Sequence, residues 1–276
     1  MASRKEQKEQ ARAARIAQEQ ASAESAQRRR RLQILGGAVV VAVIVIVAAI
    51  VISSGGGNKP TGSSLTTGSQ ATAAQSAVNA ELANIPQSGT TLGNPNAKVT
   101  LTYFGDLQCP ICADFTLGKG GGGWPEFVAK QVKPGNVKVT YRSFCTASCN
   151  NTSVSNPQAL FNTQQEAAYA AGKQSKFWDY AELFYHLQGT EGTPYVNESF
   201  LTGLAHLTNG LNVPNWRVAR HNPVYAAQVT ADNGLATKYG VNATPSFVIK
   251  GPKGIQSVGS GVLTYSQLES AVNAVS

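Results

Sequence analysis

Two cysteines separated by two residues stand in the segment FGDLQCPIC, residues 104–112. Cys109 and Cys112 could ligate a metal, close an inert disulfide or carry out redox chemistry, because a thiolate is both a metal ligand and a nucleophile. Pro110 indicates the first turn of a helix, where proline is tolerated. The unpaired N–H groups at a helix N-terminus favour an anion, so we expect the pKa of the Cys109 thiol to be lowered.

Cys112 lies one turn further along the same expected helix, close enough to form a disulfide with Cys109. We expect it to point into the protein, where desolvation raises the pKa of a thiol. The pattern therefore predicts an exposed nucleophile, Cys109, and a protected resolving thiol, Cys112. Ile111 cannot supply the positive charge that an imidazolium would place beside the thiolate, which argues against a very oxidising disulfide.

A second pair of cysteines, Cys145 and Cys149, stands in the segment FCTASC. In an oxidising compartment this pair is expected to form a structural disulfide, which contributes about 2 kcal/mol for so short a loop. A second redox pair that exchanges with the first is one alternative. A site in which all four cysteines bind zinc is another.

The N-terminal region predicts a membrane anchor. Residues 34–52 form a run of 19 residues without a charge or a proline, directly after four arginines. As a helix this run spans about 28 Å, close to the bilayer core of about 30 Å. The arginines should remain in the cytoplasm, so we expect a cytoplasmic tail at 1–31 and an anchor at 32–52. A cleavable signal peptide is the alternative, but no A-x-A site follows the run.

The net charge of +8 lies mostly in the tail, because residues 1–31 carry nine basic and four acidic side chains. The rest of the chain shows no basic stripe that would follow phosphates, so we do not expect it to bind nucleic acid. Residues 53–90 are rich in Gly, Ser, Thr, Ala and Gln and predict a flexible linker, with a short helix near AVNAELANI. As a coil these 38 residues reach about 34 Å.

The pattern of elements from residue 91 onward predicts an α/β domain. A strand at 98–104, a helix from Pro110 and a strand at 136–144 form a βαβ unit with parallel strands. Four segments with helical spacing follow in an insertion at about 155–238, the last of them at 217–240. A strand at 246–251, a paired strand and a helix capped by Thr264 complete the chain.

Three segments, TLGNPNAKVTLTYFGDLQCPIC, KFWDYAELFY and YGVNATPSFVI, together resemble the DsbA-like family. The resemblance covers residues 91–276 and implies a thioredoxin fold with an inserted helical subdomain. It also implies that Thr244 and Pro245 form a cis-proline loop that lines the client groove. Many family members carry a buried acid six residues before the first cysteine, where this chain has Tyr103. Asp106 is nearer the pair, but aspartate is also a common turn residue.

The sequence therefore predicts an extracytoplasmic thiol–disulfide oxidoreductase, anchored by one transmembrane helix, that introduces disulfides into client proteins through Cys109 and Cys112. The resemblance implies reduced extracytoplasmic proteins as clients and a membrane oxidase that regenerates the disulfide. No metal or organic cofactor is expected. The alternatives are a disulfide reductase or isomerase, and a zinc-bound or redox-silent binding module outside the cytoplasm.

Overall fold

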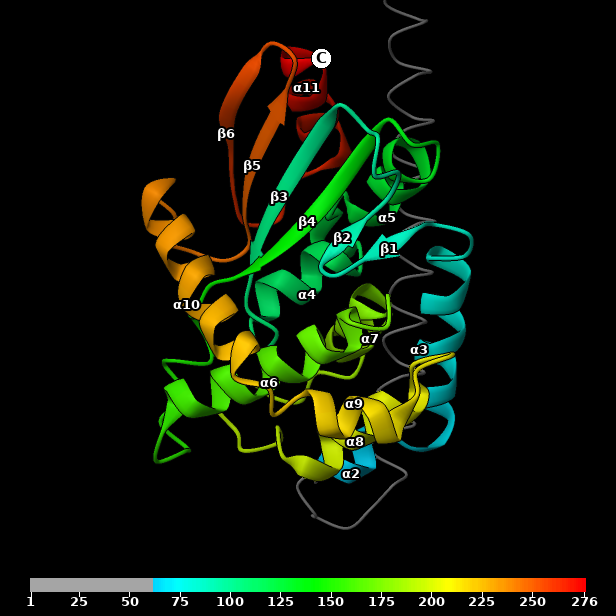
Figure 1. Cartoon of the computed structure of the whole chain (residues 1–276), viewed down its shortest axis with the longest axis vertical. Coiled ribbons are helices and arrows are strands. Elements are labelled where there is room, and N and C mark those ends of the chain that lie inside the picture. The colour runs from blue at the N-terminus through cyan, green and yellow to red at the C-terminus, as the bar shows by residue number, and fades with distance from the viewer. Residues whose placement is uncertain (1–61) are drawn as a thin grey trace, which may run out of the picture. The chain divides into compact units, whose positions relative to one another are not determined.

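The computed structural model describes residues 62–276 (Figure 1). The predicted tail at 1–31 and the predicted anchor at 32–52 lie outside these residues. Within 62–276 no helix has both the length and the apolar character needed to cross a bilayer.

A six-stranded sheet forms the centre of the domain, in the order β1-β2-β4-β3-β5-β6 (Figure 1). The predicted parallel pairing is confirmed, because Val99 of β3 lies opposite Val137 of β4 and Gly105 lies opposite Ser143. The strands are β1 (Gln87–Ser88), β2 (Thr91–Leu92), β3 (Val99–Gly105), β4 (Val137–Ser143), β5 (Ser246–Gly251) and β6 (Gly254–Ser260). The short hairpin of β1 and β2, which extends the sheet beside β4, was not predicted from the sequence.

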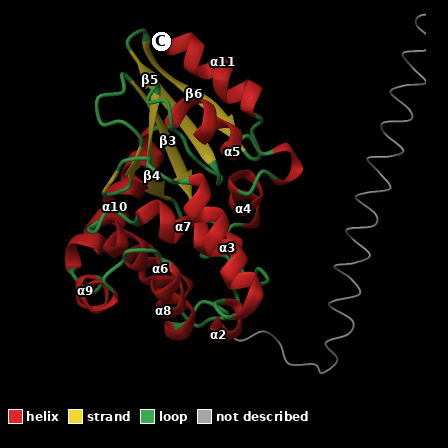
Figure 2. Ribbon diagram, turned by 90° about the vertical axis from the view of Figure 1, so that its right-hand side faces the viewer, coloured by secondary structure: helices red, strands yellow, loops and turns green. Residues whose placement is uncertain are grey.

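Helices cover both faces of the sheet. Figure 2 shows α11 (Tyr265–Val275) on one side of the strands and α10 (Pro223–Lys238) on the other. Alternation along the strands explains the two layers: Tyr103 packs into the main core with α11, whereas the neighbouring Phe104 packs with Ala236 of α10. The predicted cap of α11 is confirmed, since Thr264 and Gln267 form a capping box.

The helix that carries the cysteine pair is α4 (Pro110–Thr116), followed by a 3₁₀ turn η1 (Lys119–Gly121), α5 (Trp124–Phe127) and a π turn η2 (Val128–Val132). The glycine run between α4 and α5 breaks the helix as predicted. Its last member, Gly123, is also required by packing, because a Cβ there would lie 2.2 Å from the backbone nitrogen of Tyr265. This close approach joins α5 to the start of α11.

The helical insertion contains α6 (Pro157–Gly172), α7 (Phe177–His186), α8 (Glu198–Leu207), α9 (Val213–Ala219) and α10. The sequence predicted one helical segment over residues 217–240, but the structure divides it between α9 and α10. Pro223 has no N–H to continue a helix, and the side chain of Asn222 instead caps α10 by accepting a bond from Val224 N.

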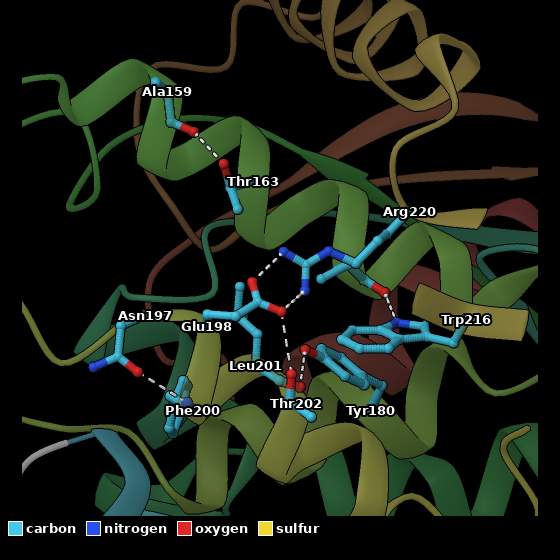
Figure 3. A network of polar contacts seen from close by, with 11 residues as sticks. Ala159, Thr163, Tyr180, Asn197, Glu198, Phe200, Leu201, Thr202, Trp216 and Arg220 are labelled. Atoms are coloured by element: carbon cyan, nitrogen blue, oxygen red, sulfur yellow. Dashed lines mark hydrogen bonds and ion pairs between the residues drawn. The ribbon is translucent and has the colours of Figure 1, made fainter. Parts of the chain in front are cut away.

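The helices of the insertion are joined by a polar network around Arg220 (Figure 3). Its guanidinium donates to both carboxylate oxygens of Glu198, at 3.0 and 2.7 Å, and lies 5.0 Å from the ring centre of Trp216. The indole of Trp216 donates to Ala167 O, and Tyr180 donates to Leu201 O. These bonds tie α6, α7, α8 and α9 into one unit.

The structure differs from the predicted linker over part of its length. Residues 62–85 form α2 (Gly62–Leu65), α3 (Gly68–Glu81) and a turn, and they pack on the insertion. Ala71, Ala74 and Val78 lie on one face of α3 and are buried in the main core. Because alanine is small and only weakly apolar, the sequence of this segment shows little amphipathic pattern. The same small side chains allow α3 to pack closely against α7.

Candidate active site

Cys109 lies where β3 turns into α4, and it is the N-cap residue of that helix. Cys112 lies one turn further on, and both thiols are free. Cys112 is fully buried, as predicted. Cys109 differs from the prediction of an exposed nucleophile, because only 5% of its surface is accessible. The backbone oxygen of Thr244, 3.4 Å from the Cys109 sulfur, is part of what covers it.

The two thiols have opposite acidities. Hydrogen bonding from the Cys112 side chain is the largest effect on Cys109 and lowers its pKa to about 7. Burial opposes this effect, while hydrogen bonds from the Thr244 side chain and the Cys112 backbone add to it. Burial raises the pKa of Cys112 well above its usual range, with further increases from the neighbouring Cys109. The pair thus contains one thiol that ionises near neutral pH and one that stays protonated.

The loop before β5 lies directly beside Cys109. The peptide bond between Thr244 and Pro245 is cis. Antiparallel pairing of β5 with β3 places Ser246 opposite Phe104, which brings the preceding residues to the edge of the sheet where β3 ends. The Cys109 thiol donates to Thr244 O. The structure therefore brings together the four residues that the sequence analysis assigned to redox exchange and client binding.

A buried carboxylate, Asp106, organises the loops at this edge of the sheet. Its Oδ1 accepts bonds from Gln108 N at 3.0 Å, Ser148 Oγ and Gln164 Nε2, and its Oδ2 accepts from the backbone N–H groups of Thr146 and Ser148 at 2.9 and 2.8 Å. Both oxygens are occupied by these donors. Asp106 is therefore a structural clamp rather than a group placed to carry protons.

A second contact fixes the cysteine loop from the side of the helical insertion. Gln188, just after α7, donates from Nε2 to Leu107 O at 2.6 Å and to Cys109 O at 3.1 Å. Neither Gln188 nor Gln164 was predicted from the sequence to hold the loops of the site. Each is separated from its partner by more than fifty residues, and no local pattern marks a glutamine as the anchor of a distant loop.

Cys145 and Cys149 form a disulfide immediately after β4, with their Cα atoms 5.7 Å apart. Parallel strands end at the same edge of a sheet, so this loop lies beside the loop that follows β3. The disulfide uses two of the four cysteine sulfurs, which disfavours the four-cysteine zinc site. Over residues 62–276 no group of three or more His, Cys, Asp or Glu side chains is arranged to hold a metal ion.

Tyr103, which stands six residues before Cys109 in the chain, lies behind Cys112. Its hydroxyl lies 3.3 Å from Thr116 Oγ1 and donates to Cys112 O at 3.5 Å. Burial raises the pKa of Tyr103 well above its usual range, so the phenol remains protonated near neutral pH. Its ring packs against Phe115 and Trp124. The surroundings of Cys112 are therefore apolar and aromatic.

The reduced protein should be alkylated first at Cys109. We expect the rate of reaction with iodoacetamide to rise with pH and to reach half its maximum near pH 7, because only the thiolate reacts and the pKa of Cys109 is about 7. Cys112 should react only at much higher pH. Mass spectrometry of peptides from samples quenched at each pH measures both rates. Preferential labelling of Cys112 would reverse the assignment of the two thiols.

Comparisons with known proteins agree with this geometry. A family model described as thioredoxin matches residues 86–274. Disulfide bond formation protein D of Bacillus subtilis is 25% identical over 158 residues, 57% of this chain and 66% of that protein. Probable disulfide bond formation protein D of Bacillus cereus is 22% identical over 162 residues, 58% of this chain and 69% of that protein. The chain thus spans about two thirds of the length of these relatives.

Solved structures show the same fold. BdbD from Bacillus subtilis in its oxidised form superposes with a TM-score of 0.54 at 20% identity, covering 68% of this chain and 94% of BdbD. Alpha-DsbA1 from Wolbachia pipientis gives a TM-score of 0.52 at 17% identity, covering 70% of this chain and 91% of that structure. Since the family model matches most of its length, the chain belongs to the thioredoxin family, and its fold is similar to that of these DsbA-like structures.

Proposed function

We propose that the chain is an extracytoplasmic thiol–disulfide oxidoreductase that introduces disulfides into client proteins. The observation that supports this most directly is the unequal pair of thiols, with Cys109 at a helix N-terminus and a pKa of about 7 beside a fully buried Cys112. A nucleophile and a protected resolving thiol are what disulfide exchange requires. An inert structural disulfide would need no such difference in acidity.

The reaction starts from the oxidised pair. A client thiolate attacks the Cys109 sulfur, the bond between the two cysteines breaks, and Cys112 leaves as a thiolate that takes up a proton. The second client thiolate then attacks the client sulfur of the mixed disulfide and releases Cys109 as a thiolate. The client loses two electrons and gains one disulfide, and the pair gains the two electrons. The second step favours the thiol with the lower pKa as the sulfur that bonds to the client, because a thiolate of low pKa is the better leaving group.

The client would bind along the loop of Thr244 and Pro245. This loop borders Cys109, and Ile111 beside the pair is 43% exposed although it is a large apolar side chain. An extended client segment could therefore place its cysteine next to Cys109 and apolar side chains on Ile111. The low exposure of Cys109 means that a client sulfur has a narrow approach to it.

Variants of the two cysteines test these roles. Cys112→Ser should trap mixed disulfides between Cys109 and a client peptide that contains a disulfide. The Cys109 thiolate displaces one sulfur of that disulfide, and the thiol that would resolve the product within the pair is gone. Cys109→Ser should trap few, since the remaining thiol is buried and stays protonated. Non-reducing gels and mass spectrometry identify the linked residues. Trapping mainly by Cys109→Ser would contradict the proposed mechanism.

The direction of electron flow is proposed from two observations. The curated relatives are named as disulfide bond formation proteins. Stabilisation of the Cys109 thiolate favours the reduced form of the pair and makes its disulfide a better oxidant. A pKa of about 7 is less extreme than that of the strongest oxidants of this fold, so we propose an oxidant of intermediate strength.

Equilibration with glutathione measures this strength. We expect a reduction potential for the 109/112 pair between the value of about −270 mV typical of thioredoxin and the value of about −120 mV typical of DsbA. A potential near or below that of thioredoxin would instead support a disulfide reductase. An isomerase would be indicated if the protein rearranged scrambled disulfides faster than it oxidised a reduced client.

The location of the domain is also a proposal. The apolar run at 34–52 and the four arginines before it favour an anchor with the tail in the cytoplasm and the catalytic domain outside. A membrane oxidase would then regenerate the disulfide, and reduced proteins outside the cytoplasm would be the clients. The disulfide between Cys145 and Cys149 fits an oxidising compartment.

Protease accessibility tests the topology. Protease added to intact cells, or to spheroplasts if an outer membrane is present, should digest the folded domain while a cytoplasmic marker protein stays intact. Complete protection of the domain under conditions that leave the marker intact would reverse the orientation. Digestion of the domain after lysis provides the matched control for its intrinsic sensitivity.

A further inference from the structure

The loop of the second disulfide contacts the active site through a side chain that the proposed mechanism does not use. We infer that Thr146 is a positioning residue that directs the hydroxyl group of Thr244 toward the Cys109 sulfur. The inference deepens the proposed function and rests on Cys109 acting as the nucleophilic thiolate. It gives the segment between Cys145 and Cys149 a part in redox exchange that needs no transfer of electrons to that disulfide.

Two contacts connect Thr146 to Cys109 through Thr244. The hydroxyl groups of Thr146 and Thr244 are hydrogen-bonded to each other, and either could be the donor. Thr244 in turn meets Cys109, because its backbone oxygen lies 3.4 Å from the sulfur and its side chain favours the thiolate over the thiol. Thr146 therefore reaches the nucleophile through one intermediate residue.

The direction of the hydrogen bonds follows from the charge on Cys109. A thiolate accepts hydrogen bonds and cannot donate, so it favours the rotamer in which the single proton of the Thr244 hydroxyl points toward sulfur. The bond between the two threonines then requires Thr146 to be the donor. Each bond in such a chain polarises and strengthens the next. Thr146 thus selects the orientation of Thr244 that stabilises the thiolate.

Thr146 is held in place from both sides. Its backbone N–H donates to Asp106 Oδ2 at 2.9 Å, and the same oxygen accepts from Ser148 N at 2.8 Å. The disulfide between Cys145 and Cys149 closes the loop around these two residues. Reduction of that disulfide would leave Thr146 less restrained. The disulfide of Cys145 and Cys149 can therefore influence Cys109 through a hydrogen bond. A shuttle would instead exchange disulfides between the two pairs of cysteines.

The test compares three variants of the whole chain with the wild type. Thr146→Val keeps the shape of the side chain and removes its hydroxyl donor, whereas Thr146→Ser keeps a hydroxyl at this position. Thr140→Val is the matched control, because it breaks another threonine–threonine bond, 3.1 Å long, between Thr140 and Thr91 within the sheet. Circular dichroism and thermal unfolding establish that each variant is folded. The readouts are the rate of alkylation of Cys109 against pH and the equilibrium of the 109/112 pair with glutathione.

We expect Thr146→Val to raise the pKa of Cys109 by about half a pH unit, the effect of weakening one hydrogen bond to a charged group. At a pH below 7 this slows alkylation about threefold, since the thiolate fraction falls in proportion. The glutathione equilibrium should shift toward the disulfide form of the pair. Thr146→Ser and Thr140→Val should match the wild type in both measurements.

An unchanged or faster alkylation of Thr146→Val, or an equal effect of Thr140→Val, would overturn the inference. A double substitution, Cys145→Ala with Cys149→Ala, supplies a second arm: it should slow alkylation in the same direction, and Thr146→Val should add little to it. Fully additive effects would show that the loop and Thr146 act independently. A different result would contradict the proposed function itself, namely that the wild-type 109/112 pair exchanges no disulfides with glutathione or clients.

Discussion

The structure around the active site depends on one buried carboxylate. Asp106 follows β3 and accepts hydrogen bonds from the loop that carries Cys109, from the loop that follows β4 and from the side chain of Gln164 in α6. An unpaired buried charge would be costly, so these three segments must keep their donors in position for the fold to be stable. The clamp joins the sheet, the cysteine pair and the helical insertion at one point. Because both of its oxygens accept hydrogen bonds in this clamp, Asp106 is poorly suited to carry protons.

Different surroundings give two chemically identical residues different acidities within one helical turn. Cys109 stands at the N-cap position of α4, and hydrogen bonds from the side chains of Cys112 and Thr244 lower its pKa, whereas Cys112 is fully buried. Behind Cys112 lies a cluster of large rings in which Trp124 stacks on Trp178. The insertion therefore does more than enlarge the domain, because its helix α7 supplies part of the apolar wall that keeps the second thiol protonated.

The parts of this site that could be predicted from the sequence are those encoded by local patterns. Pro110 indicated the helix start, alternation indicated β3 and β4, and Thr264 indicated the cap of α11. What could not be predicted depends on distant contacts. Gln188 holds the Cys109 loop although 79 residues separate the two in the chain. The alanines of α3 become core residues only because of the surface on which they pack. The low exposure of Cys109 likewise depends in part on Thr244, which is 135 residues away in the chain.

The same clamp helps to explain why Cys109 is only moderately acidic. The negative charge of Asp106 raises the pKa of Cys109, and burial raises it more. Hydrogen bonds from Cys112 and Thr244 outweigh both effects and bring the pKa to about 7. Ile111 offers no positive charge that could lower it further. Burial and the charge of Asp106 thus oppose the ionisation that the proposed disulfide exchange needs. The net acidity of Cys109 therefore depends on how well the donors around its sulfur are aligned.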